Sequence, residues 1–482
     1  MTVRSFYHAL DQFHENPRLI EYTTTLPGNL LFWLAVQGLL LFTRYQYLVP
    51  LMILVQLLPR WRMWIMTLSL GGWFVFNKLT QLDPIVPFWY FFNTFIIIGS
   101  LYLFYRLSLA FASLPRTVRN HPQLFLHGFL WLCILVISLL PARYIDSPEW
   151  PIANNLTTCV VFFAFLVWRI GFMLYSGKRG SIKQTGFVDH LVYCLPFLGY
   201  TQVPYGKGLD YLLPKLAKER LELAKVQLAG VKLLVLASMW DLFLDLLDMA
   251  VIGPHQTAPW RLGLYHIAEL VALGTNAMPS FGIVWGSLFV DMVYETTQVA
   301  ISGHLIIGCL RLFGFNVFRN TYKPLLSQTL VDFWNRYYYY FKELLVDFFF
   351  FPTYLSFFKG HPRLRIFTAT MASAFFGNFY YHFLQHFDLL LIKGALPPMT
   401  HFSSYLFYCF VLAIGIFVSI LREQNQRGRP HPVRAPWLAV LVLARRIAGV
   451  WLFFAILRIW DHTNSSFISD TKFFFALLGI HW

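Results

Sequence analysis

The sequence predicts an all-α polytopic membrane protein. Of its 482 residues, 57% are hydrophobic and only 13% are charged, whereas a soluble domain carries about 25% charged residues. The mean hydropathy is +0.55, and the apolar residues are gathered into long runs. Aromatic residues make up 19% of the chain, which suits lipid-facing and interfacial surfaces. Composition alone therefore argues against a soluble globular protein.

The apolar runs predict about 11–13 membrane helices. Residues 1–26 are polar and mixed in charge, which favours a short helix at the membrane surface, and residues 27–482 then form a single integral membrane domain. In chain order the expected apolar segments are Leu30–Leu58 (one kinked helix, or a span and a shorter piece), Trp64–Leu79, Pro87–Ala112, Leu124–Leu140, Ile152–Tyr175, Leu228–Ile252, Leu262–Leu273, Phe281–Val299, Ile301–Phe313, Ile366–Ile392, Phe402–Leu421, Pro436–Trp460 and a short Phe473–Trp482 tail.

Two stretches between these runs predict other elements. Phe187–Tyr200 is too short to cross a hydrocarbon core of about 30 Å. It also contains Pro196, which favours a re-entrant or interfacial element. Leu209–Val226 is rich in charged and helix-forming residues, so we expect an amphipathic helix that leads into the next apolar run.

The formal net charge of +15 does not indicate a nucleic-acid-binding protein, because Lys and Arg gather in the cytoplasmic loops of polytopic proteins. This rule assigns the loop around Arg365 to the cytoplasm and sets His382 within the span that follows. The five cysteines form no CxxC pair, so no zinc site or disulfide framework is predicted.

One apolar run carries a polar stripe that indicates chemistry. At about 100° per residue, Asn378, His382, Gln385 and His386 fall within one sector of a helix, which Phe375 shares. Such a stripe should face protein or water, because lipid cannot satisfy its hydrogen bonds. A neutral imidazole can take a proton from a hydroxyl and return it. The alternative is a histidine bonded to a carbonyl or to Asn378 one turn away.

A second unusual stretch, DFWNRYYYYFKELLVDFFFFP, runs from Asp332 to Pro352. On a helix its four consecutive tyrosines point in all directions, so at least one or two hydroxyls need partners inside the protein. We expect the aromatic helix to end at Pro352. The alternative interpretation is an aromatic girdle at the membrane interface.

Together these stretches resemble the membrane-bound O-acyltransferase (MBOAT) family. The resemblance rests on Phe333-Trp334-Asn335-Arg336, on the aromatic helix after it, and on His382 in an apolar span further along. It extends over residues 187–421, with Asp189–Leu212 similar to an earlier element of the family. Tyr338 stands where many members have a histidine, and Gly377-Asn378-Phe379-Tyr380-Tyr381-His382 replaces the family's Gly-x-Trp-His.

The resemblance implies a ring of helices that encloses a tunnel. A thioester donor, acyl-CoA or an acyl-carrier protein, would enter from the cytoplasm, and no other cofactor is implied. The acceptor would be a hydroxyl or amine of an exported glycan, cell-wall polymer or lipid. The protein would lie in a bacterial inner membrane, where bacterial relatives often work with a periplasmic or extracellular partner protein. His382 would be the general base and Asn335 its polar partner, with Tyr338 second. The residues expected to contact substrate are Trp334, Arg336, Tyr338, Asn378, Gln385 and His386.

Other functions remain open from the sequence. Asp241, Asp245 and Asp248 share one helix face, as do Asp291 and Glu295. Acidic groups inside spans often mark ion or proton paths, which favours a proton-coupled transporter or flippase; alternatively, both sets lie near helix ends at the membrane surface. A non-catalytic membrane scaffold is a third interpretation. Two histidines at i, i+4 could hold a metal, but the stretch lacks the glutamate of HExxH motifs, so no metal is predicted.

Overall fold

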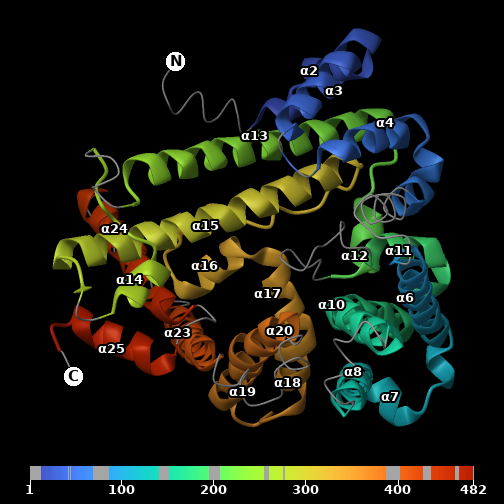
Figure 1. Ribbon diagram of the computed structural model, residues 1–482. Coiled ribbons are helices and arrows are strands. Elements are labelled where there is room, and N and C mark those ends of the chain that lie inside the picture. The colour runs from blue at the N-terminus through green and yellow to red at the C-terminus, as the bar shows by residue number, and fades with distance from the viewer. Residues whose placement is uncertain are drawn as a thin grey trace. The chain divides into compact units, whose positions relative to one another are not determined.

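The computed structural model describes residues 12–41, 43, 45–68, 86–139, 151–194, 207–253, 260–274, 277–386, 402–426, 436–461 and 466–480. Helices dominate these residues, which contain no strand (Figure 1). The predicted all-α class is therefore confirmed. The chain forms two compact units: unit 1 is Met1–Ser238 with Ser302–Arg319, and unit 2 is Met239–Ile301 with Asn320–Trp482. The predicted division at residue 26 stays a prediction.

Three helical stretches are long and apolar enough to cross a membrane: Leu156–Arg179, Ser403–Gln426 and Trp437–Trp460. A fourth arises if Gln46–Leu57 and Pro59–Leu68, bent by 118° at their junction, count as one span. The membrane class is thus supported by these helices. The larger predicted number of spans stays a prediction, because the other apolar helices among the described residues are shorter or carry more polar groups.

Unit 1 contains the N-terminal helices. They are α2 (Pro17–Thr24), α3 (Leu26–Leu40), α4 (Val49–Leu57), α6 (Val86–Leu109), α7 (Arg116–Asn120), α8 (Pro122–Ser138), α10 (Pro151–Arg179), α11 (Phe187–Cys194) and α12 (Leu209–Leu212). The Leu30–Leu58 run is therefore a helix and a shorter piece. Helices α6, α8 and α10 pack together around a stacked Phe104–Phe163 pair, 5.6 Å between centroids, beside an apolar cavity of about 390 Å³.

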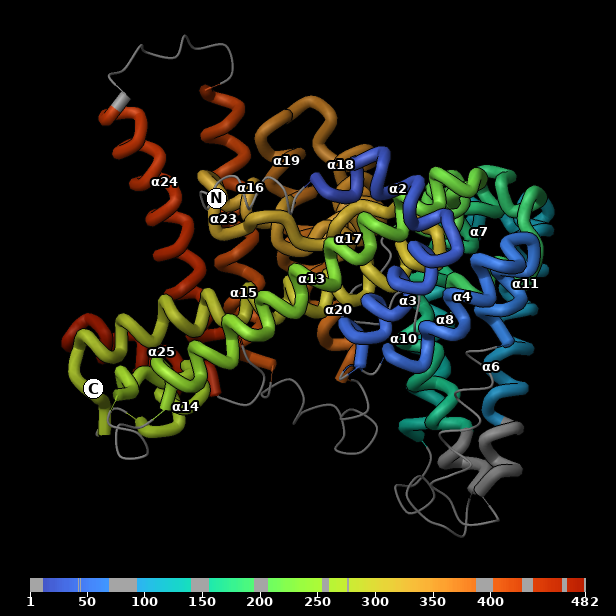
Figure 2. The backbone as a smooth tube through the Cα atoms, turned by 90° about the horizontal axis from the view of Figure 1, so that it is seen from above, coloured from blue at the N-terminus to red at the C-terminus, as the bar shows by residue number. Residues whose placement is uncertain are grey.

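Two long helices, α13 (Arg220–Ala250) and α15 (Phe281–Leu312), have residues in both units. In unit 1 they approach closely, since a Cβ on Gly230 would lie 2.9 Å from the carbonyl oxygen of Gly308. In unit 2 the Tyr294 hydroxyl donates to Asp248 at 3.2 Å. The two helices run side by side in both views (Figures 1 and 2).

Helix α15 corrects one prediction. The sequence divided it into Phe281–Val299 and Ile301–Phe313, but it is a single helix of 32 residues. The polar residues close to the expected division are accommodated inside the helix: Thr296 and Thr297 are buried, and the Thr297 hydroxyl donates to the carbonyl of Val293 at 2.7 Å. Burial against protein thus lets the helix continue through a polar patch.

Unit 2 contains the remaining helices. They are α14 (Ile267–Leu273), α16 (Leu330–Tyr337), α17 (Tyr339–Leu345), α18 (Phe351–Ser356), α19 (Pro362–Thr370), α20 (Asn378–Gln385), α23 (Ser403–Gln426), α24 (Pro436–Leu457) and α25 (Phe467–Leu477). Pro352 was expected to end the aromatic helix, but it lies in the first turn of α18. A π-helix, Val346–Phe350, comes directly before α18, so the helical run from Tyr339 continues through Pro352 and ends at Ser356.

Candidate functional site

Two π-helices lie beside the predicted catalytic region in unit 2. Val346–Phe350 joins α17 to α18, and Met371–Gly377 joins α19 to α20. They pack against each other where the ring of Phe349 occupies the space of a missing side chain at Gly377. Single π turns inside α-helices are rare overall, but those that occur are often found at functional sites. Here the second one ends at the residue before the turn that carries Asn378 and His382.

His382 is half-buried on α20 and surrounded by aromatic rings. Its imidazole lies 5.0 Å from the ring of Tyr405, 5.4 Å from Tyr381 and 5.6 Å from Phe341, each in an edge-to-face arrangement. Neither ring nitrogen has a hydrogen-bond partner among the described residues. The rings therefore hold the imidazole in place without using either of its nitrogens.

Asn378 lies one helical turn before His382 and is 1% exposed. The Tyr405 hydroxyl on α23 donates to its Oδ1 at 3.4 Å. Its Nδ2 is buried without a hydrogen-bond partner among the described residues. Asn378 and His382 therefore share one aromatic neighbour, Tyr405.

The rest of the stripe points elsewhere. Gln385 is half-buried, and His386 is exposed at the end of α20, with its ring 5.8 Å from that of Phe402. Phe375 was expected to share the sector, but it lies in the π-helix, where the α-helical angle per residue does not apply, and it packs on Phe410. Within the described residues, no group of three His, Cys, Asp or Glu side chains could hold a metal ion.

The aromatic stretch approaches His382 through one intermediary. Trp334 is buried, and its ring lies 6.1 Å from that of Phe341, while the half-buried Tyr338 lies 5.5 Å from the same ring. Phe341 in turn contacts His382. Tyr338 has φ −142° and ψ 69°, which separates α16 from α17 and turns the chain between these contacts.

Asn335 and Arg336 do not join this cluster in the part of the chain that the structure describes. Asn335 is exposed on α16 and has no hydrogen bond to His382. Arg336 forms an ion pair with Asp332 at 2.7 Å along the same helix. The contact expected between Asn335 and His382 is thus not seen. Asn335 lies on a different face of α16 from the buried Trp334.

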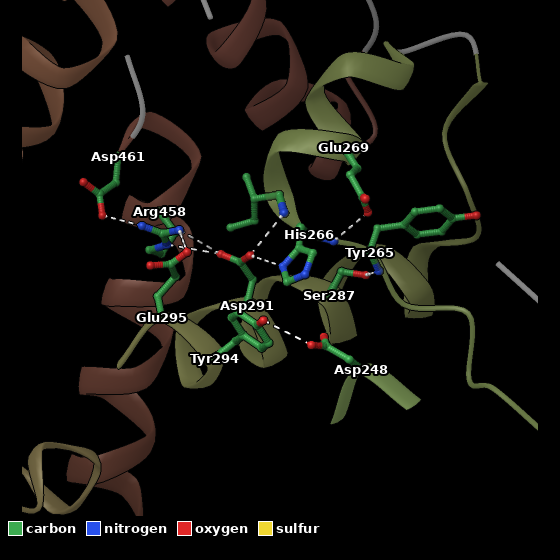
Figure 3. A network of polar contacts seen from close by, with 11 residues as sticks. Asp248, Tyr265, His266, Glu269, Ser287, Asp291, Tyr294, Glu295, Arg458 and Asp461 are labelled. Atoms are coloured by element: carbon green, nitrogen blue, oxygen red, sulfur yellow. Dashed lines mark hydrogen bonds and ion pairs between the residues drawn. The ribbon is translucent and has the colours of Figure 1, made fainter. Parts of the chain in front are cut away.

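A second polar cluster, here called the Arg458 cluster, contains Asp291, Glu295, Arg458, Asp461 and His266 (Figure 3). Asp291 is 3% exposed and accepts hydrogen bonds from Arg458 at 3.1 and 3.2 Å. Arg458 also contacts Glu295 at 3.4 Å and Asp461 at 2.6 Å. One guanidinium thus bridges three carboxylates from two separate parts of the chain.

His266 completes this cluster from the loop before α14. Its Nδ1 lies 3.1 Å from the Asp291 carboxylate, while Glu269 accepts a hydrogen bond from its backbone N–H. The hydrogen bond to Asp291 raises the pKa of His266 above its ordinary value of 6.5. The imidazole and Arg458 approach Asp291 from opposite sides (Figure 3), so both side chains contact the buried carboxylate.

The acidic residues of the two helices lie in different environments. Asp241 and Asp245 are exposed, and Asp248 lies near the end of α13. Asp291 was alternatively expected near a helix end at the surface, but it is buried in the interior of α15. It avoids the cost of an isolated buried charge because Arg458 and His266 pair with it.

Sequence reasoning missed three of these participants. Tyr405, His266 and Arg458 meet their partners across 27, 25 and 167 residues of chain. Helical periodicity assigns residues to a face but gives no information on which distant residue packs there. The one available signal was an arginine at the end of an apolar run close to Asp461, since buried charges need partners. No protein-family model and no curated protein matches the chain.

Proposed function

We propose that the protein is a membrane O-acyltransferase of the MBOAT type, with His382 as its general base. The observation that supports this most is the position of His382: half-buried, held by three aromatic rings and without a hydrogen bond to either nitrogen from the described residues. A histidine with a structural role would bond a carbonyl or a neighbouring side chain. An imidazole with free nitrogens can instead receive the proton of an acceptor hydroxyl.

In the proposed reaction, the neutral imidazole takes the proton of the acceptor hydroxyl as its oxygen attacks the thioester carbonyl carbon. The carbon–sulfur bond then breaks, and the departing thiolate takes the proton from the imidazolium. The products are an ester and a free thiol, so no other reactant is needed. General base catalysis of this kind contributes about 10²–10⁴-fold to the rate.

The aromatic cluster gives the other predicted residues their proposed roles. Trp334 and Tyr338 pack on Phe341, which contacts His382, so they shape the wall that a donor chain would pass. Asn335 is exposed and therefore contacts substrate only outside this wall. Gln385 and His386 follow His382 toward the end of α20, where an acceptor hydroxyl would approach.

The proposal also includes the architecture, the location and the substrates of the enzyme. The helices form a ring around a tunnel in a bacterial cytoplasmic membrane. The donor is acyl-CoA or an acyl-carrier protein on the cytoplasmic side, and the acceptor is an exported glycan, a cell-wall polymer or a lipid. A periplasmic or extracellular partner protein takes part in the transfer.

The test compares purified wild-type protein in nanodiscs with His382→Ala, and with His361→Ala as a matched control in an exposed histidine. Acetyl-CoA, hexadecanoyl-CoA and a hexadecanoyl acyl-carrier protein serve as donors, a bacterial membrane extract supplies lipid and glycan hydroxyls as acceptors, and released thiol carrier is measured by mass spectrometry. We expect His382→Ala to reduce turnover by about 10²–10⁴-fold while His361→Ala keeps it. Equal turnover in wild type and His382→Ala would contradict the proposal.

The Arg458 cluster favours a second candidate, a proton-coupled transporter. Ionisable side chains inside membrane proteins often mark proton paths, and a histidine beside a carboxylate can take up and release a proton near neutral pH. In proteoliposomes with a pH gradient, Asp291→Asn would then abolish substrate-driven proton movement, read by a pH-sensitive dye inside the vesicles, while His382→Ala would leave it unchanged. Proton movement that persists in Asp291→Asn, or that is absent in wild type, would contradict the transporter.

A further inference from the structure

The amide of Asn378 is a buried donor without an acceptor. Its Nδ2 has no hydrogen-bond partner among the described residues, and the side chain is 1% exposed. Leaving such a group unpaired costs about 1–3 kcal/mol, and buried polar side chains rarely lack a partner. A polar group kept at this cost beside a free histidine is available to a ligand.

Tyr405 fixes which atom of the amide is free. Its hydroxyl donates to Oδ1 of Asn378 at 3.4 Å, and its ring packs edge-to-face on His382 at 5.0 Å. A second ring, Tyr408, stacks on Tyr405 at 5.2 Å and holds it from behind. The amide is thus oriented with Nδ2 as the remaining donor, one helical turn from the imidazole.

A neutral N–H donor beside a neutral base suits a substrate carbonyl whose oxygen acquires negative charge, because the donor can bond that oxygen while the base takes up the proton of the attacking group. When an oxygen attacks a thioester, the carbonyl oxygen becomes an oxyanion, and a fixed donor in a water-poor site stabilises it more than water can. A hydroxyl acceptor, by contrast, gives up its proton to His382 and offers no lasting acceptor to Nδ2. The pair therefore suits a substrate carbonyl.

We propose that Asn378, oriented by Tyr405, donates from Nδ2 to the thioester carbonyl oxygen during attack. The inference rests on the proposed acyltransferase function and goes beyond it, because it assigns oxyanion stabilisation to Asn378 and not to Asn335 or Tyr338. Asn378 is then a catalytic residue, and Tyr405 is a positioning residue that acts through it. The bonds that form and break are those of the acyl transfer described above.

The first experiment separates this role from a structural one. Asn378→Leu removes both amide groups at similar volume, and Asn378→Leu/Tyr405→Phe also removes the hydroxyl that would lose its acceptor. We expect the double variant to be at least as stable as wild type, because the amide and the hydroxyl that bond to each other are removed together, and to lose about 10²–10³-fold in kcat. Tyr405→Phe should lose about 10-fold, and Tyr22→Phe, a control on an exposed tyrosine of α2, should stay within about threefold of wild type.

The second experiment tests the carbonyl directly by binding. Hexadecanoyl-CoA has the carbonyl, and S-hexadecyl-CoA has a methylene in its place. If Nδ2 contacts the carbonyl, Asn378→Leu weakens binding of the thioester by about three- to tenfold and leaves binding of the thioether unchanged. Equal weakening of both ligands means that Asn378 shapes the pocket without contacting the carbonyl, which overturns the inference.

The outcomes distinguish this inference from the function on which it rests. If wild type turns over a donor, His382→Ala does not, and Asn378→Leu keeps turnover within about threefold, the inference fails while the acyltransferase stands. If wild type releases no thiol from any of the three donors, the proposed function fails and the inference falls with it.

Discussion

The guanidinium of Arg458 holds the buried carboxylate of Asp291 with two nitrogens, Nε at 3.2 Å and Nη2 at 3.1 Å, across 167 residues of chain. The contact joins the end of α24 to the middle of α15 within unit 2. Both side chains are largely withdrawn from solvent, at 20% and 3% exposure. The pair therefore behaves as a buried ion pair, in which loss of one partner costs more than the pair itself contributes.

Replacing Arg458 by Met should lower the free energy of unfolding by about 3–5 kcal/mol, because Asp291 loses its main counter-charge in a buried site. Unfolding in mixed micelles with rising SDS fraction, followed by tryptophan fluorescence, measures the change. Arg445→Met, on an exposed part of α24, is the control and should stay within about 0.5 kcal/mol of wild type. Adding Asp291→Asn to Arg458→Met should recover part of the loss; an unchanged or larger loss in the double variant would contradict the pairing.

His266 should make stability depend on pH. Its folded pKa is raised above 6.5 by the hydrogen bond to Asp291, so its contribution is fully present below pH 6.5 and is lost as the pH rises through the folded pKa. We expect His266→Gln to cost about 1 kcal/mol at pH 5.5 and progressively less toward pH 8.5.

Unfolding of wild type and variant in the same micelles at four pH values measures this difference. His361→Gln, an exposed histidine, should show no such trend. A His266→Gln penalty that grows with pH would reverse the predicted sign and exclude a stabilising protonated imidazole.

The sequence predicted helices well where a run of residues is apolar along its whole length. The expected Ile152–Tyr175, Phe402–Leu421 and Pro436–Trp460 appear as α10, α23 and α24, with ends that differ by a few residues. Predictions failed where packing overrides the pattern. Buried Thr296 and Thr297 lie inside α15 because protein neighbours surround them, and the π-helix at Met371–Gly377 shifts the faces assumed for an unbroken α-helix.

The candidate site was predictable only from residues close together in the chain. Asn378 and His382 share a face because they are four residues apart, and the structure gives them a common neighbour. The contact expected between Asn335 and His382 depended on the packing of two separate helices, which periodicity does not determine. Tyr405 supplies the neighbour instead, from a helix that the sequence marked only as apolar.

Thr329 should stabilise the helix that carries Trp334. Its hydroxyl caps α16 by accepting from the N–H of Asp332 at 3.0 Å and donates to Glu423 on α23 at 2.7 Å. Thr329→Ala should therefore cost about 1–2 kcal/mol, whereas Thr329→Ser should cost less than half of that. Thr368→Ala, at a half-buried threonine bonded only within its helix, is the control in the same unfolding assay. Equal losses from Thr329→Ala and Thr368→Ala would argue against the cap.

Gly377 should be intolerant of any side chain, because its missing Cβ is what allows the two π-helices to pack. A Cβ there would lie 2.6–3.0 Å from three atoms of the Phe349 ring, well inside contact distance. Gly377→Ala should therefore lower the free energy of unfolding by about 1–3 kcal/mol. It should also reduce acyl turnover, since the displaced helix carries His382 one turn further on.

A paired substitution tests whether the ring is the cause. Phe349→Ala vacates the space, so Gly377→Ala/Phe349→Ala should be less destabilised than the sum of the two single variants, with a coupling of about 1 kcal/mol or more. Gly449→Ala, on a helical glycine with nothing within 4 Å of its added Cβ, should be neutral within about 0.5 kcal/mol. If the two losses of unfolding free energy are additive instead, the contact between Gly377 and the Phe349 ring is not what makes the glycine necessary. Gly377 would then be needed for its backbone conformation.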